Sequence, residues 1–107
     1  MYSIKSRTRK IIKDFIEKAG SEYKIDKAYI FGSFAKDRWN ENSDVDIAIF
    51  SKNFNDNNRI EVLSNLLLMV SQYKIDIQPL VFSYNDLFDK ENDFVKNEIK
   101  KRGIEIK

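Results

Sequence analysis

Two aspartates one residue apart are the clearest sign of chemistry in this chain of 107 residues. Asp44 and Asp46 stand at the start of an apolar run, and positions i and i+2 of a strand share one face of a sheet. Neighbouring carboxylates repel each other unless a cation lies between them, and hard oxygen ligands suit Mg²⁺. The alternative is a solvent-facing strand start at which aspartate caps a turn. An isolated pair of this kind is more often structural, so the pair needs support from its surroundings.

A Gly-Ser pair, Gly32 and Ser33, closes another apolar run. Glycine lets a phosphate approach the backbone closely, and free N–H groups at a helix start after Ser33 would favour that phosphate. On its own the pair also fits a simple turn with Ser33 as a helix N-cap. Together with Asp44 and Asp46, it predicts a site that holds a phosphate and the cation that neutralises it.

Asp76 is the third candidate, because it stands between Ile75 and Ile77 in a further apolar run. A carboxylate embedded in an apolar strand is costly unless it is paired or binds a metal. If this strand lies beside the one that carries Asp44 and Asp46, three carboxylates converge. They would hold two cations, with Asp76 close enough to accept a proton from an attacking hydroxyl. The other interpretation is an aspartate on the exposed face of an edge strand.

Two segments have the apolar periodicity of helices that would support this site. The first covers residues 4–19, and Gly20 is its expected C-cap. The second begins at Asn58, which with Glu61 resembles a capping box, and runs to about residue 72. Its predicted core side consists of Ile60, Leu63, Leu66, Leu67 and Val70.

Three short apolar segments are predicted to be strands, at residues 27–31, 45–50 and 75–82. Pro79 indicates an edge strand or a bulge, because proline donates no ladder hydrogen bond. Residues 84–102 are partly helical, and Ile104 and Ile106 suit an extended tail. This order predicts an α/β (α+β) fold, a single domain over residues 1–107 with helices packed on a small mixed sheet.

The composition excludes several kinds of mechanism. The chain contains no His and no Cys, which excludes a histidine general base, a thiolate metal site and a disulfide scaffold. Catalysis would have to use carboxylates, Lys, Tyr, Ser or a bound cation. No apolar stretch follows the charged N-terminus, and the longest apolar run, Leu66 to Val70, is far too short to cross a membrane. A cytoplasmic location is therefore expected.

The charges are unevenly distributed, although the formal net charge is only +2. Residues 31–95 are acidic overall, whereas both ends of the chain are basic. The basic clusters are Arg7, Arg9, Lys10 and Lys13, and Lys100, Lys101 and Arg102. One hypothesis is that they bind nucleic acid, which would show steep salt dependence. The small net charge gives this hypothesis weak support, and solvated helix faces explain the same residues.

Taken together, the motif resembles the nucleotidyltransferase superfamily typified by DNA polymerase β. Gly32-Ser33 is followed after ten residues by Asp44-x-Asp46 and then by an aspartate in a later strand. The short length resembles the minimal nucleotidyltransferase (MNT) branch, and the resemblance covers about residues 25–82, with the tail over 93–107 also compatible. It implies a mixed sheet flanked by helices, and transfer of a nucleoside monophosphate from an NTP to a hydroxyl.

The resemblance also implies a role for each residue of the motif. Gly32 and Ser33 would hold the triphosphate of ATP. Asp44 and Asp46 would bind two Mg²⁺ ions, and Asp76 would bind the catalytic ion and assist deprotonation of the acceptor.

This chain departs from the pattern at one point. Many MNT sequences have Arg after the Ala of their Gly-Ser-x-Ala stretch, whereas here Ala35 is followed by Lys36 and Asp37. Lys36 and Arg38 are the candidate nucleotide contacts in its place.

Small MNT proteins resemble the antitoxin halves of HEPN/MNT toxin–antitoxin pairs. The resemblance implies a HEPN ribonuclease toxin as partner, neutralised by AMP transfer to a toxin tyrosine in a type VII-like system. The alternatives are a catalytically silent antitoxin that neutralises the toxin by binding, and a small hydroxylated antibiotic as acceptor. Phe34, Trp39 and Phe54 are candidate aromatics for a partner surface; otherwise they pack on the sheet edge.

Overall fold

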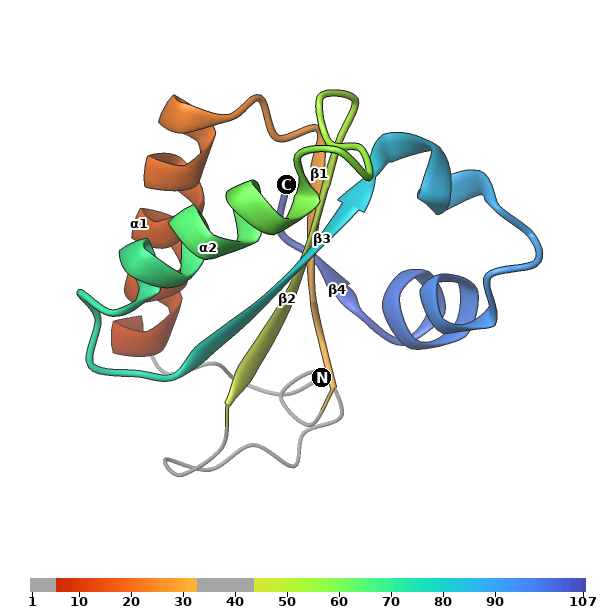
Figure 1. Cartoon of the computed structure of the whole chain (residues 1–107). Coiled ribbons are helices and arrows are strands. Elements are labelled where there is room, and N and C mark those ends of the chain that lie inside the picture. Colours follow the sequence, from red (N-terminus) through yellow and green to blue (C-terminus); the bar gives the residue numbers. More distant parts are fainter. Residues whose placement is uncertain (1–5, 33–43) are drawn as a thin grey trace.

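The structure is a computed structural model that describes residues 6–32 and 44–107 (Figure 1). The described helices are α1 (Ser6–Glu22), α2 (Arg59–Val70), the 3₁₀ helix η1 (Tyr84–Phe88) and the π-helix η2 (Phe94–Lys101). The described strands are β1 (Lys27–Phe31), β2 (Val45–Ser51), β3 (Ile77–Ser83) and β4 (Ile104–Glu105). No helix in the described ranges is long and apolar enough to span a membrane.

The strands form one mixed sheet in the order β3-β2-β1-β4. β1 is antiparallel to both β2 and β4, whereas β2 and β3 are parallel. Parallel neighbours need a crossover connection, which α2 supplies between β2 and β3. The predicted α+β fold with a small mixed sheet is confirmed. β3 lies at the edge of the sheet, as Pro79 indicates.

The two faces of the sheet are covered by different elements (Figure 1). Side chains alternate along β2, so Val45, Ile47 and Ile49 pack in the cluster with α1 and α2. Ala48 and Phe50 face the other way and pack in the cluster with η1 and η2. Asp46 lies between Val45 and Ile47 and therefore shares the face of Ala48 and Phe50.

The predicted C-cap at Gly20 is wrong, whereas Asn58 is the N-cap residue of α2 as predicted but without the capping-box hydrogen bond. α1 continues through Gly20 to Glu22, and the N–H of Tyr23 donates to the Ala19 carbonyl at 2.8 Å. The Asn58 side chain caps no helical N–H and instead accepts a hydrogen bond from the Asn55 N–H at 2.9 Å. Local turn contacts therefore compete successfully with the capping pattern.

The orientation of α2 also differs from the prediction. Val62 and Leu66 are its buried residues, while Ile60 is 80% exposed and Leu67 is 45% exposed. Leu63 and Val70 are partly buried against the core, as predicted. Apolar residues occur all around this helix, so their spacing does not select one face.

Candidate active site

Asp44 directly precedes β2, and Asp46 is the second residue of that strand. Asp44 is exposed and Asp46 is half-buried. Burial raises the pKa of Asp46, and the nearby negative charge of Asp44 raises it further. Within the described ranges, no Lys or Arg forms an ion pair with either aspartate. The pair is therefore a concentrated negative charge that a cation would stabilise.

Gly32 makes room for the Asp46 carboxylate. Asp46 is the register partner of Phe31 in the antiparallel β1–β2 pair, so Gly32 follows directly beside it. A Cβ at position 32 would overlap Asp46 Oδ2 and lie 3.3 Å from Asp46 Cγ. Gly32 also has φ +75°, a left-handed conformation that favours glycine. Gly32, which is expected to admit a phosphate, therefore has a second role: its missing side chain leaves the space that the Asp46 carboxylate occupies.

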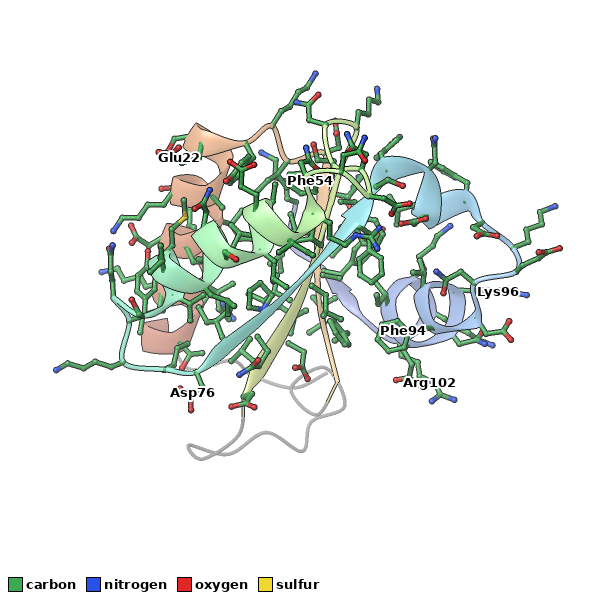
Figure 2. All side chains as sticks on the ribbon, in the orientation of Figure 1. Glu22, Phe54, Asp76, Phe94, Lys96 and Arg102 are labelled. Carbon is green, nitrogen blue, oxygen red and sulfur yellow. The ribbon has the colours of Figure 1, made fainter. Side chains whose placement is uncertain are left out.

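Asp76 lies level with Asp44 at the same end of the sheet. Val45 pairs with Ile77 in the parallel register, and the Val45 N–H donates to the Asp76 carbonyl at 2.8 Å. Val45 and Ile77 both face α1 and α2, so the alternation assigns Asp44 and Asp76 to the opposite face, with Asp46. Figure 2 shows Asp76 at the point where β3 begins.

Asp76 is exposed, as in the alternative interpretation of an exposed aspartate at an edge strand, and the predicted start of its strand at residue 75 is two residues early. β3 begins only at Ile77, so Asp76 precedes the strand, and its side chain is exposed. The carboxylate therefore pays no large desolvation cost, and its exposure leaves it accessible to a ligand.

The donor chemistry of these residues fits Mg²⁺, which prefers carboxylate oxygens. Asp44 and Asp46 lie together without a cationic partner among the described residues, and Asp76 lies on the neighbouring strand. In this part of the chain, however, no group of three or more acidic side chains is close enough to hold one ion. The described geometry thus provides a carboxylate pair and an adjacent third carboxylate, and not a closed three-carboxylate site.

The other predicted site residues divide into two groups. Ser33, Lys36 and Arg38, together with the aromatics Phe34 and Trp39, lie outside the described residues. Phe54 is described and is only 2% exposed, with its ring against Tyr23 at 5.8 Å between centroids. The prediction that Phe54 belongs to an exposed partner surface is therefore wrong.

One neighbour of the site was not predicted. Gln78 is the register partner of Asp46 on β3, and its side chain is exposed. An amide there is available for hydrogen bonds to a ligand. Its position two residues after Asp76, on the same face, is the signal that would have identified it.

Comparison with known protein families places the chain in a family. The family model described as "Polymerase beta, Nucleotidyltransferase" matches residues 10–106. No curated protein matches the chain significantly, and no solved structure does. The matched range includes Gly32, Asp44, Asp46 and Asp76, and the mixed sheet with its helices is compatible with the nucleotidyltransferase fold. Because the match spans nearly all of the sequence, the chain belongs to the polymerase β nucleotidyltransferase family, and its function is of the nucleotidyltransferase kind.

Proposed function

We propose that this chain is a Mg²⁺-dependent enzyme that transfers AMP from ATP to a hydroxyl group of a protein. The observation that carries the proposal is the Asp44–Asp46 pair, placed beside Gly32 and level with Asp76 at one end of the sheet. These carboxylates have no cationic partner among the described residues, so they suit a substrate that arrives as a metal–triphosphate complex.

The reaction needs positioning and charge neutralisation more than covalent help from the protein. Mg²⁺ held by Asp44 and Asp46 would supply charge neutralisation at the triphosphate. Asp76 is exposed, so it is available to accept the proton of the acceptor hydroxyl. The hydroxyl oxygen forms a bond to the α-phosphorus of ATP, the bond to the bridging oxygen breaks, and pyrophosphate leaves. The absence of His from the chain is compatible with this mechanism.

For the acceptor, we propose a tyrosine of a cognate HEPN ribonuclease toxin, which makes the chain the antitoxin of a type VII-like pair. The support is the resemblance of this short chain to MNT antitoxins, on the Gly32-Ser33 and Asp44-x-Asp46 motif. ATP as the donor rests on the same resemblance.

The test is label transfer to a candidate HEPN ribonuclease partner. The two proteins are incubated with Mg²⁺ and ATP labelled at the α-phosphate, and in parallel with ATP labelled at the γ-phosphate. We expect label on the partner from α-labelled ATP alone, with a mass increase of one AMP on a tyrosine. Label from γ-labelled ATP would instead show a kinase, and no label from either would contradict AMP transfer.

Two variants test the assignment of residues. Asp44→Asn and Asp46→Asn should each lower the rate of transfer by a factor on the order of 10² or more, because each removes a charged ligand while keeping the shape. Asp93→Asn, at an exposed aspartate beside η2, is the matched control and should keep the wild-type rate. Full activity of Asp46→Asn would overturn the metal assignment.

If variants without transfer activity still protect cells from the toxin, neutralisation occurs by binding.

A further inference from the structure

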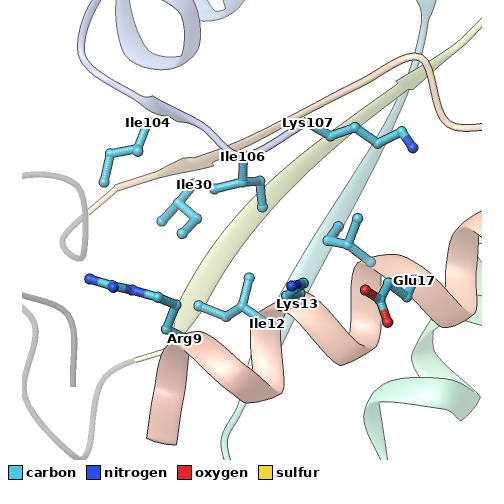
Figure 3. A pocket seen from close by; sticks show the side chains of 9 residues that line it. Arg9, Ile12, Lys13, Glu17, Ile30, Ile104, Ile106 and Lys107 are labelled. Atoms are coloured by element: carbon cyan, nitrogen blue, oxygen red, sulfur yellow. The ribbon is translucent and has the colours of Figure 1, made fainter. Parts of the chain in front are cut away.

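A groove with an apolar floor lies between α1 and the strands β1 and β4 (Figure 3). Its volume is about 530 Å³. The floor is formed by Ile12, Ile16, Ile30, Ile104 and Ile106. Packing defects in protein interiors are rarely larger than a water molecule, whereas ligand pockets have volumes of several hundred Å³. The size and lining of this groove therefore indicate a binding surface.

The rim of the groove is positively charged. Arg9 and Lys13 are four residues apart on α1, so both side chains project from one face of the helix. Lys107 lines the opposite wall. No described carboxylate forms an ion pair with any of these three cations. Glu17 is the one acidic residue among the described residues that line the groove, so the rim keeps an excess of positive charge.

The dimensions of the groove favour a protein segment. Arg9 and Glu17 are eight residues apart on α1, which corresponds to about 12 Å along the helix axis. A small inorganic anion would satisfy the cations but leave the isoleucine floor uncovered. A segment that presents apolar side chains to the floor and carboxylates to Arg9 and Lys13 would satisfy both.

The groove also lies close to the candidate active site. Ile30 forms part of its floor, and Gly32, beside Asp46, follows two residues later, about 7 Å further along the chain. The groove lies on the face of the sheet that α1 covers, whereas Asp46 lies on the opposite face. A protein held in the groove would therefore reach the carboxylates around the end of β1, where Gly32 follows the strand.

We propose that the groove docks the protein acceptor, through an acidic segment with apolar side chains on one face. This inference rests on the proposed function for the identity of the bound protein. The chemistry of the bound segment rests on the groove alone.

The first experiment tests the ligand chemistry with peptides. A fluorescein-labelled helical peptide carries leucine along one face and glutamate on both sides of that face, and a second peptide has lysine in place of each glutamate. By fluorescence anisotropy, the wild-type chain should bind the acidic peptide at least about tenfold more tightly than the basic one. Equal affinity for the two peptides would overturn the proposal.

Charge reversal locates the binding. The double variant Arg9→Glu/Lys13→Glu should bind the acidic peptide at least about tenfold more weakly and should prefer the basic peptide. Lys10→Glu/Lys101→Glu makes the same change in net charge at exposed residues outside the groove and should keep the wild-type preference. Thermal unfolding by circular dichroism checks that both variants are folded. Equal loss of binding in the two variants would show a general charge effect and overturn the assignment to the groove.

Dodecanoate is the competing small ligand. If it binds the groove more tightly than the acidic peptide and displaces it, the site takes an anionic amphiphile, and the protein-segment assignment fails.

The last measurement separates this inference from the proposed function. In the label-transfer assay, Arg9→Glu/Lys13→Glu should raise the KM for the acceptor protein and leave the affinity for ATP and the kcat unchanged. An unchanged KM would overturn docking of the acceptor in the groove. If the wild-type chain labels no acceptor but the peptides bind as expected, the proposed function fails while the acidic ligand specificity stands.

Discussion

Gly32 shapes the candidate site at the scale of a single residue. Gly32→Ala would place a Cβ against the Asp46 carboxylate in a left-handed backbone conformation, so we expect a loss of about 1–2 kcal/mol in stability. Nucleotidyl transfer should also fall, because Asp46 is displaced. Gly20→Ala is the matched control, since nothing lies within 4 Å of that Cβ inside α1, and it should stabilise the protein by about 0.5–1 kcal/mol. Urea unfolding measures both, and equal effects would contradict the geometry at Gly32.

The Asp46 carboxylate should lower the stability of the folded chain, although the proposed reaction requires it. Burial and the charge of Asp44 both raise the pKa of Asp46, so its ionised form is disfavoured in the folded state at neutral pH. We therefore expect Asp46→Asn to increase the Tm by a few degrees in the absence of metal. Added Mg²⁺ should raise the Tm of the wild-type chain but not that of the variant. A lower Tm for metal-free Asp46→Asn would show that the carboxylate is structurally required.

The aspartates show which residue-scale features a sequence determines. The common face of Asp44 and Asp46 follows from the two-residue period of a strand, which is a property of the backbone. The exposure of Asp76 depends on where β3 begins, and the contact between Gly32 and Asp46 depends on the register of two strands. Both are tertiary facts that local patterns do not encode.

At the scale of elements, α2 offers a test of which face is the core face. Leu66 is fully buried, whereas Leu68 on the same helix is 68% exposed. We expect Leu66→Ala to cost about 2–5 kcal/mol of stability, and Leu68→Ala to change it by less than about 0.5 kcal/mol. Chemical denaturation of both variants checks this, and comparable losses would mean that α2 is rotated differently or that Leu68 is covered in solution.

The bounds of β1 and β2 were predicted more closely than those of β3, which begins two residues later than the predicted start at residue 75. β1 begins and ends where the sequence predicts, and β2 extends the prediction by one residue, because short buried runs bounded by polar residues have little freedom. Gly20 did not end α1, because a glycine tolerates a helical conformation. Asn58 does mark the start of α2, but its side chain accepts from the Asn55 N–H instead of capping the helix. In α2, burial against α1 and β3 selects the inner face, and helix periodicity alone does not.

At the scale of the whole molecule, an ion pair connects the last strand to the sheet. Lys27 Nζ donates to Glu105 Oε2 at 2.9 Å, and Tyr29 Oη donates to Glu105 Oε1 at 3.3 Å. The hydrogen bond and charge of Lys27 lower the pKa of Glu105. The stability that Glu105 contributes is thus present above the ordinary glutamate pKa and is lost as the pH falls through its lowered folded value.

Glu105→Gln should therefore have a lower Tm than the wild-type chain at pH 7, by a small amount because the pair is exposed. This difference should shrink as the pH falls through the lowered pKa of folded Glu105, because the wild-type carboxylate then loses its charge. Glu91→Gln, at an exposed residue, is the control and should match the wild-type Tm at pH 7 and at acidic pH. A constant difference for Glu105→Gln across the pH range would show that packing, and not charge, connects β4 to β1.

Pro79 has a consequence for how separate molecules meet. The Asp76 carbonyl accepts from β2, so by alternation the backbone groups of Gln78 and Leu80 also face β2, and the nitrogen of Pro79 faces the free edge of β3. That edge lacks one donor at its centre, and β4, at the other edge of the sheet, is only two residues long. Both edges of the sheet therefore offer few backbone hydrogen-bonding groups to a strand from another copy of the chain. This disfavours aggregation by strand addition to the sheet.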